Sequence, residues 1–155
     1  MATLAIGDIH GNIRALDDLL SRITAEIAGD DMVVFLGDYI DRGPDSKACI
    51  ERVLDFRRTS KGGVVALLGN HEDWLLRTYH DHTRHSWILG MEAFSTIRSY
   101  SPDAAATLAE VIGNLGARVV LDHLPLPYQL FFDMVPPEHI AFFSSLRTFF
   151  RTPEA

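Results

Sequence analysis

Residues 33–43 read VVFLGDYIDRG, an apolar run that passes directly into a glycine and then into polar residues. Two other stretches repeat this arrangement, LAIGD at residues 4–8 and VVALLGN at residues 64–70. Short continuous runs of Val, Ile and Leu are typical of strands that are covered on both faces. The sequence therefore predicts three buried strands, each followed by a glycine and then by Asp8, Asp38 or Asn70.

The segments between these runs predict helices. Apolar residues recur at spacings of three and four from Ile13 to Ile27, and again from Cys49 to Leu54 after the helix-start signal Pro44–Ser46. Connections that alternate strand and helix join parallel neighbours within one sheet. We therefore expect an α/β fold.

The second half of the chain is less decisive. We expect a short helix after Glu72, a solvated polar loop over residues 79–85, and capped helices after Ser101 and Pro136. Residues 118–121 and 128–134 fit either short strands or helix extensions. Cys49 is expected to be buried and inert. The phenylalanines expected in the core are Phe131, Phe132, Phe142, Phe143, Phe149 and Phe150.

Composition and charge exclude several classes of protein. The 155 residues, 47% of them hydrophobic, predict a single globular domain over residues 1–155. Fourteen basic and 21 acidic residues give a net charge of −7, which argues against binding the phosphates of nucleic acids. No apolar run approaches the roughly 20 residues that cross a membrane. With one cysteine and no visible signal peptide, we expect a cytoplasmic protein.

The ends of the three predicted strands carry the chemistry. Ligands bind at the carboxyl ends of strands in open α/β sheets, so we expect Asp8, His10, Asp38 and Asn70 to meet at one edge. Carboxylate, imidazole and amide oxygen together suit Mn²⁺, Fe or Zn²⁺ better than Ca²⁺. We expect Asp8 and His10 to chelate a first ion, Asp38 to bridge two ions, and Asn70 to bind the second. Two such ions clamp a phosphate around a bridging hydroxide.

The residues beside these ligands suggest the remaining roles. Arg42 carries a planar fork that matches phosphate oxygens. His71 is placed to protonate a leaving alkoxide, and Asp41 to hold the His71 imidazole in one tautomer. Phosphate contacts are thus expected from Arg42, Asn70 and His71. Glu72 is expected to steady a neighbouring loop or the start of the next helix.

Three motifs, GDIHGN at 7–12, GDYIDRG at 37–43 and GNHE at 69–72, resemble the calcineurin-like metallophosphoesterase superfamily. The Asp-Arg-Gly of the middle motif is similar to its phosphoprotein phosphatase branch. The resemblance covers residues 1–75 strongly. It implies two divalent metal ions held by the ligands above, with manganese expected first, and two β-sheets packed together with helices outside.

The C-terminal half departs from this family pattern. Such proteins take two further histidines and a second phosphate-binding arginine from that half, and neither histidine motif is present before Ala155. We therefore expect an incomplete metallophosphoesterase-type β-sandwich, with the second sheet largely missing and an open sheet edge available for self-association. His123 and His139 are not favoured as substitute ligands. A fragment of a longer enzyme is preferred over a rearranged region 91–155 or a completing second chain.

The resemblance implies hydrolysis of phosphate monoesters by a metal-bound hydroxide. The first expectation is a serine/threonine protein phosphatase acting on phosphorylated proteins or small phosphoesters. The alternative is hydrolysis of dinucleoside polyphosphates such as diadenosine tetraphosphate. A second alternative is that the chain is not an active enzyme but a catalytically weak or silent metal-binding domain, because Asp38 and Asn70 alone give the second ion few ligands.

Overall fold

The computed structural model describes residues 1–152, which form three strands and nine helices. The strands are β1 (Thr3–Ile6), β2 (Met32–Phe35) and β3 (Gly63–Ala66). The helices are α1 (Ile13–Glu26), α2 (Ser46–Thr59), α3 (Asn70–His80), α4 (Ser86–Gly90), α5 (Phe94–Tyr100), α6 (Pro102–Leu115), α7 (Arg118–Leu121), α8 (Gln129–Phe132) and α9 (Pro137–Ser144).

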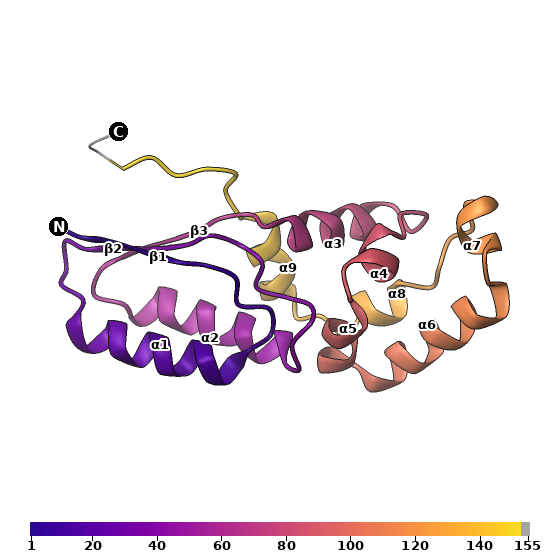
Figure 1. Cartoon of the computed structure of the whole chain (residues 1–155), viewed down its shortest axis with the longest axis horizontal. Helices are drawn as coiled ribbons and strands as arrows, with labels where there is room; N and C mark the ends of the chain where they lie inside the picture. The colour runs from indigo at the N-terminus through magenta and orange to yellow at the C-terminus, as the bar shows by residue number, and fades with distance from the viewer. Residues whose placement is uncertain (153–155) are drawn as a thin grey trace.

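The three strands form a parallel sheet in the order β1-β2-β3. Leu4 pairs in register with Val33, and Val33 with Val64. Because crossovers between parallel strands are right-handed, a sheet that grows in one direction places its connecting helices on one face. Helices α1 and α2 both lie on the same side of the sheet (Figure 1). The expected α/β architecture is confirmed, but the expected burial of all three strands is wrong for β1, where Ile6 alone is buried and Leu4 is 39% exposed.

One part of the core lies between the sheet and these two helices, and the core continues into the helical region through Trp87 and Phe131. Val33 and Phe35 of β2 are fully buried, and the Phe35 ring packs 6.1 Å from the ring of Phe56 on α2. Leu20 of α1 and Cys49 of α2 are also fully buried, so the inert position expected for Cys49 is confirmed. This packing of the sheet on α1 and α2 holds the strand ends in position.

The helix starts follow local capping chemistry. The side chain of Asn12 accepts a hydrogen bond from Ala15 N at the start of α1. Asp45 caps α2, and Ser101 caps α6, in the same way. Each side chain satisfies one of the backbone N–H groups that a helix start leaves unpaired. The starts expected after Pro44–Ser46 and Ser101 are confirmed.

Helices α3 to α8 extend beyond the carboxyl ends of the strands (Figure 1). The loop expected from residue 79 is wrong at its start, because α3 begins at Asn70 and continues to His80. Burial of Leu75 and Thr78 along one face, with an Asp73–Arg77 ion pair on the surface, stabilises the longer helix. Residues 118–121 and 129–132, left open by the sequence, are helices.

Two further expectations are corrected. His85 is buried rather than solvated: its Nε2 atom lies 2.9 Å from Leu124 O, and its Nδ1 atom 3.1 Å from the Tyr128 hydroxyl. Phe149 is 66% exposed and Phe150 is half-buried, so neither belongs to the core, because the chain beyond its pairing at Arg147 runs along the surface. His139 is buried on α9, as expected for a packing role.

The expected incomplete sandwich is confirmed within residues 1–152, where the only sheet is the three-stranded one. After α9 the chain returns to the far edge of β3. There Arg147 N donates to Ala66 O, and Leu68 N donates to Arg147 O, at 3.2 and 2.8 Å. Within the described residues, no helix is both long and apolar enough to cross a membrane.

Candidate metal centre

The loops after β1 and β2 adopt a strained backbone at the site. His10, Asp38, Asp41 and Arg42 have φ angles of 43°, 52°, 70° and 64°. Left-handed backbone costs about 1–2 kcal/mol for each residue other than glycine, and such residues cluster at functional sites. The Asp38 carbonyl oxygen locks the two loops together, because it accepts hydrogen bonds from the backbone N–H groups of Ile9 and His10 at 3.0 and 2.9 Å.

Glu72 holds the second loop in this shape. Its buried carboxylate accepts hydrogen bonds from the backbone N–H groups of Asp38 (2.9 Å), Tyr39 (2.9 Å), Ile40 (3.3 Å) and Gly69 (3.2 Å). Burial raises the pKa of Glu72 to about 7, with the nearby Asp38 adding to this, while the N–H donors oppose the rise. The expectation that Glu72 steadies a neighbouring loop is confirmed.

His10 presents a buried nitrogen without a hydrogen-bond partner. Its Nδ1 atom lies 2.8 Å from the Ile40 carbonyl oxygen, so Nδ1 carries the proton and Nε2 keeps a lone pair. Nε2 is buried and makes no hydrogen bond, and an Asp8 carboxylate oxygen lies 3.6 Å from it. A lone pair of this kind beside a carboxylate is the usual arrangement of a histidine that binds a metal.

Asn70 and Asp38 form the other half of the cluster. Either of two orientations of the Asn70 amide places one of its polar atoms 3.1 and 3.3 Å from the two Asp38 carboxylate oxygens. If that atom is the amide nitrogen, it donates to the carboxylate. If it is the amide oxygen, two acceptors face each other, which is favourable only with a cation between them. Either orientation places the Asn70 amide against the Asp38 carboxylate, and together with the free Nε2 of His10 this set of donor atoms fits a divalent ion.

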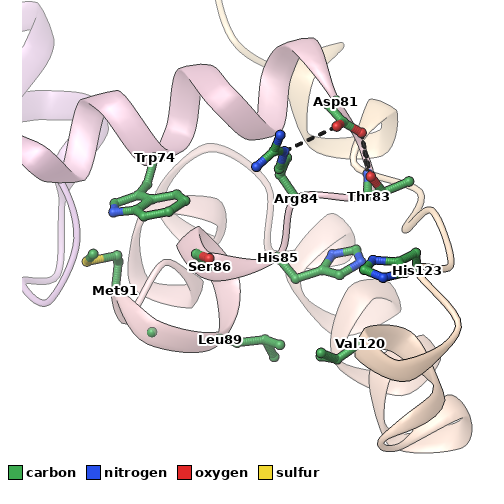
Figure 2. Close-up of a pocket in the computed structure, with 11 residues that line it drawn as sticks. Trp74, Asp81, Thr83, Arg84, His85, Ser86, Leu89, Met91, Val120 and His123 are labelled. Carbon is green, nitrogen blue, oxygen red and sulfur yellow. Dashed lines mark hydrogen bonds and ion pairs between the residues drawn. The ribbon is translucent and has the colours of Figure 1, made fainter.

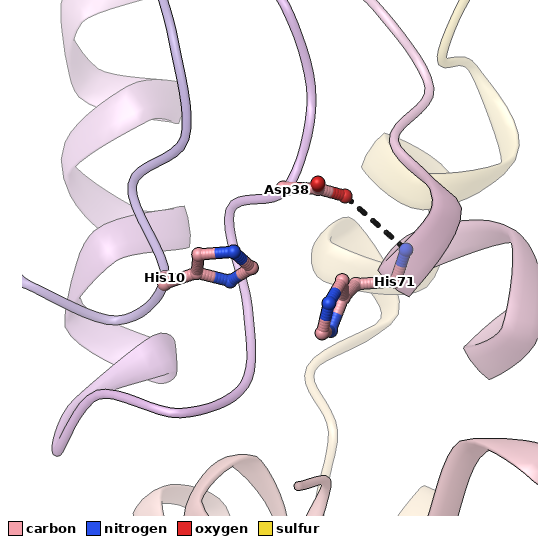
Figure 3. Close-up of side chains that lie close together, drawn as sticks. All are labelled: His10, Asp38 and His71. Atoms are coloured by element: carbon pink, nitrogen blue, oxygen red, sulfur yellow. Dashed lines mark hydrogen bonds between the residues drawn. The ribbon is translucent and has the colours of Figure 1, made fainter. Parts of the chain in front are cut away.

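His71, expected at this site as a proton donor and phosphate contact, also lies among the possible metal-binding atoms, which the sequence did not predict. One ligand atom each of His10, Asp38 and His71 lies within 4.8 Å of the others (Figure 3). The His71 backbone N–H donates to Asp38 Oδ1 at 3.2 Å. His71 is the second residue of α3, directly after Asn70, and this adjacency is the one sequence signal for its place here.

The side chain of His71 is oriented by Asp41. Asp41 Oδ2 lies 2.8 Å from His71 Nδ1, and the indole Nε1 of Trp87 donates to the same oxygen at 2.9 Å. The Thr96 hydroxyl donates to Asp41 Oδ1 at 2.6 Å. The hydrogen bond that Asp41 accepts raises the pKa of His71 above its ordinary value, against the opposing effect of burial.

Trp87 and Thr96 connect the helical region to the site, and sequence reasoning missed both. They lie 46 and 55 residues after Asp41, so no local spacing links them to it. The Thr96 hydroxyl also accepts from the Asp41 backbone N–H at 2.8 Å and contacts the Ser46 hydroxyl at 2.8 Å. Helices α4 and α5 thus position the Asp41–His71 pair.

Arg42 lies at the solvent-facing side of the site. Its side chain is 54% exposed, and its Nε atom lies 3.9 Å from the carboxylate of Glu92. An exposed pair at this distance contributes little to stability. The guanidinium group therefore remains accessible to an anion that approaches the cluster.

In this structure a parallel sheet brings carboxylate, imidazole and amide groups together at its strand ends. This arrangement is typical of a class of metal-dependent phosphoesterases. The sequence model of the calcineurin-like phosphoesterases matches residues 1–151, and the chain belongs to this family. Similar proteins include the symmetrical bis(5'-nucleosyl)-tetraphosphatase of Cellvibrio japonicus, 42% identical over 79 residues, which are 51% of this chain and 27% of that protein.

A second relative is the zinc-dependent endopolyphosphatase of Saccharomyces cerevisiae, 26% identical over 115 residues, which are 71% of this chain and 34% of that protein. The matched part of the chain thus spans about a third or less of these relatives. A crystal structure described as that of a candidate diadenosine tetraphosphatase overlaps 93% of this chain and 42% of its own, with 24% identity and a TM-score of 0.43.

Proposed function

We propose that this protein is a metal-dependent hydrolase of phosphoanhydride bonds that acts on dinucleoside polyphosphates. The observation that carries the chemistry is the cluster in which the free Nε2 of His10 faces the carboxylates of Asp8 and Asp38. The substrate class is supported by the relatives, because both the tetraphosphatase and the endopolyphosphatase are named for polyphosphate substrates.

In this proposal Asp8, His10, Asp38 and Asn70 hold the divalent ions. Bound ions supply positive charge for a phosphate and lower the pKa of water. That charge also explains how a chain with a net charge of −7 binds an anionic substrate. Mn²⁺, Fe²⁺ and Zn²⁺ are the ions compared in the test below.

The residues around the ions divide the remaining work. Arg42 pairs with oxygens of the phosphate chain through its exposed guanidinium. His71 donates a proton to the leaving oxygen, and Asp41 holds the imidazole in the required tautomer. Hydrolysis breaks one P–O bond of the anhydride and adds water across it, so diadenosine tetraphosphate cleaved at its centre yields two molecules of ADP.

The serine/threonine phosphatase expected first has weaker support. It depended on the Asp-Arg-Gly of residues 41–43, and the relatives reported above favour the alternative instead. The competing hypothesis is a silent metal-binding domain. Turnover distinguishes it from the proposed hydrolase, because a silent domain binds metal and releases no product.

The test compares two substrates on the same preparation. With Mn²⁺, Fe²⁺ or Zn²⁺ added in turn, we expect ADP release from diadenosine tetraphosphate at least tenfold faster than phosphate release from a phosphoserine peptide. Asp38→Asn serves as the inactive control. A faster reaction with the peptide contradicts the substrate class. Bound metal without turnover of either substrate contradicts the enzyme.

A further inference from the structure

A cavity of about 730 Å³ lies between α3, α4 and α7 (Figure 2). Its volume is within the range of pockets that bind small organic ligands. We propose that this cavity binds one nucleoside, base and ribose, of the dinucleoside polyphosphate. The inference rests on the proposed function and adds a binding site to it. Residues that line the cavity and carry the argument are Trp74, Arg84, Ser86, Leu89, Met91 and His123.

The cavity lies beside the metal centre. Trp74, which lines the cavity, lies one helical turn after Asn70 on α3, and four residues of helix rise about 6 Å. The Met91 sulfur lies 3.8 Å from one polar atom of the Asn70 amide and also lines the cavity. A phosphate chain held at Asp38 and Asn70 therefore delivers its nucleoside directly to Trp74 and Met91.

The wall of the cavity suits a flat aromatic base. Trp74 and Met91 lie at one end of it, and Leu89 lies between them and Val120 (Figure 2). The guanidinium carbon of Arg77 lies 5.0 Å from the centroid of the Trp74 ring. Arg77 therefore packs on one face of the ring and helps to hold the ring in place. Aromatic rings of this kind stack on nucleobases without strict sequence preference.

Apolar exposure in the cavity points to an organic ligand rather than to inorganic phosphate. Leu89 and Val120 are 51% and 52% exposed although both line the cavity. Ser86 and His123 add polar atoms to the same wall. The wall combines the exposed apolar side chains with further polar ones, those of Asp81, Thr83, Arg84 and His85. The exposed apolar part suits a small organic molecule, because an inorganic polyphosphate has no apolar surface to bury there.

The first test compares two phosphoanhydrides, of which only diadenosine tetraphosphate carries bases. In Trp74→Ala we expect kcat/KM for diadenosine tetraphosphate to fall about tenfold, the loss of one base–aromatic stack. Hydrolysis of inorganic tripolyphosphate stays within twofold of wild type. Trp74→Phe, which keeps a ring, restores most of the activity. Leu89→Arg, at an exposed position, fills the cavity and reproduces the selective loss.

Tyr79→Ala is the matched control, because Tyr79 is an aromatic residue on the same helix that packs on Phe132 instead of lining the cavity. It leaves both reactions unchanged. Equal losses for the two substrates in Trp74→Ala and Leu89→Arg, or no loss for either, overturn the proposal.

A second test does not depend on turnover. With Zn²⁺ bound, ADP quenches the tryptophan fluorescence of the wild type, while ribose 5-phosphate, which lacks the base, does not. Trp87 is fully buried, so the quenching reports Trp74, and it disappears in Trp74→Phe. If the protein hydrolyses neither anhydride, the proposed function fails and this test alone decides the cavity. Absence of quenching by ADP, or equal quenching by ribose 5-phosphate, overturns the nucleoside site.

Discussion

The imidazole Nδ1 of His71 lies 2.8 Å from a carboxylate oxygen of Asp41, and both side chains are almost fully buried. Asp41 makes this contact while its own backbone is in the left-handed region, at a φ of 70°. Its carboxylate is satisfied by Trp87 and Thr96 as well as by His71. The pair is therefore fixed before any substrate arrives, which is what a proton donor requires.

Thr96→Val tests whether α5 positions this pair. The change keeps the side-chain shape and removes the donor to Asp41 Oδ1. We expect kcat to fall about tenfold or more for phenyl phosphate, because its phenolate leaving group needs a proton. We expect little change for p-nitrophenyl phosphate, because p-nitrophenolate leaves without one. Thr96→Ser restores the hydroxyl and the rate. Equal losses with both esters indicate a purely structural role.

His71→Asn tests the proton donor itself. The Asn side chain can still donate to Asp41, so the fold is kept while the acid is lost. Turnover of phenyl phosphate, whose phenolate leaving group needs a proton, falls about 10²–10⁴-fold, the usual contribution of a general acid, and metal content measured by mass spectrometry stays at the wild-type value. His80→Asn, at an exposed histidine, changes neither. Loss of metal in His71→Asn assigns His71 to the ligands instead, as its distance from His10 and Asp38 allows.

Asp38→Asn removes the central carboxylate of the cluster. An amide keeps one oxygen and the approximate shape, but it carries no charge and cannot bridge two cations. We expect the number of ions bound per chain, measured by calorimetric titration, to decrease and turnover to be abolished. Asp30→Asn, which alters an exposed aspartate paired with the N-terminus, leaves both unchanged. Full metal content in Asp38→Asn contradicts its assignment as a ligand.

Glu72→Gln tests the loop support. Two carboxylate oxygens receive four backbone N–H groups, and the glutamine amide nitrogen places a donor against part of that set. An unsatisfied buried group costs about 1–3 kcal/mol, so we expect the free energy of unfolding in urea to decrease by that amount. Glu110→Gln is the surface control. Unchanged stability in Glu72→Gln contradicts a supporting role for the carboxylate.

His139 predicts a loss of stability in acid. Burial lowers its pKa, against the attraction of Glu51 and Glu138, with Lys47 also lowering it. Below about pH 6.5 the unfolded chain binds a proton that the folded one resists, so stability falls as pH falls through that window. In urea unfolding between pH 7.5 and 5, His139→Gln loses less stability than the wild type. His80→Gln loses as much stability over this pH range as the wild type. If His139→Gln does so too, His139 is not the cause of the loss in acid.

The strands, the helix caps and the three polar motifs were predictable from residues 1–75. Each depends on neighbours in the chain: an apolar run makes a buried strand, and Asp45 caps the helix that follows it. Parallel strands bring their carboxyl ends to one edge, so Asp8, His10, Asp38 and Asn70 were expected near one another. The chemistry of the site was therefore visible without coordinates.

Only the tertiary structure shows how those residues are held. Trp87 and Thr96 reach Asp41 across 46 and 55 residues, and Glu72 reaches the loop at Asp38 across 34. His85 is buried although its neighbours in sequence are polar, because Tyr128 and Leu124 satisfy its ring nitrogens. Strand runs and caps follow from the few residues beside them, whereas these buried contacts form only when distant segments pack together and exclude water.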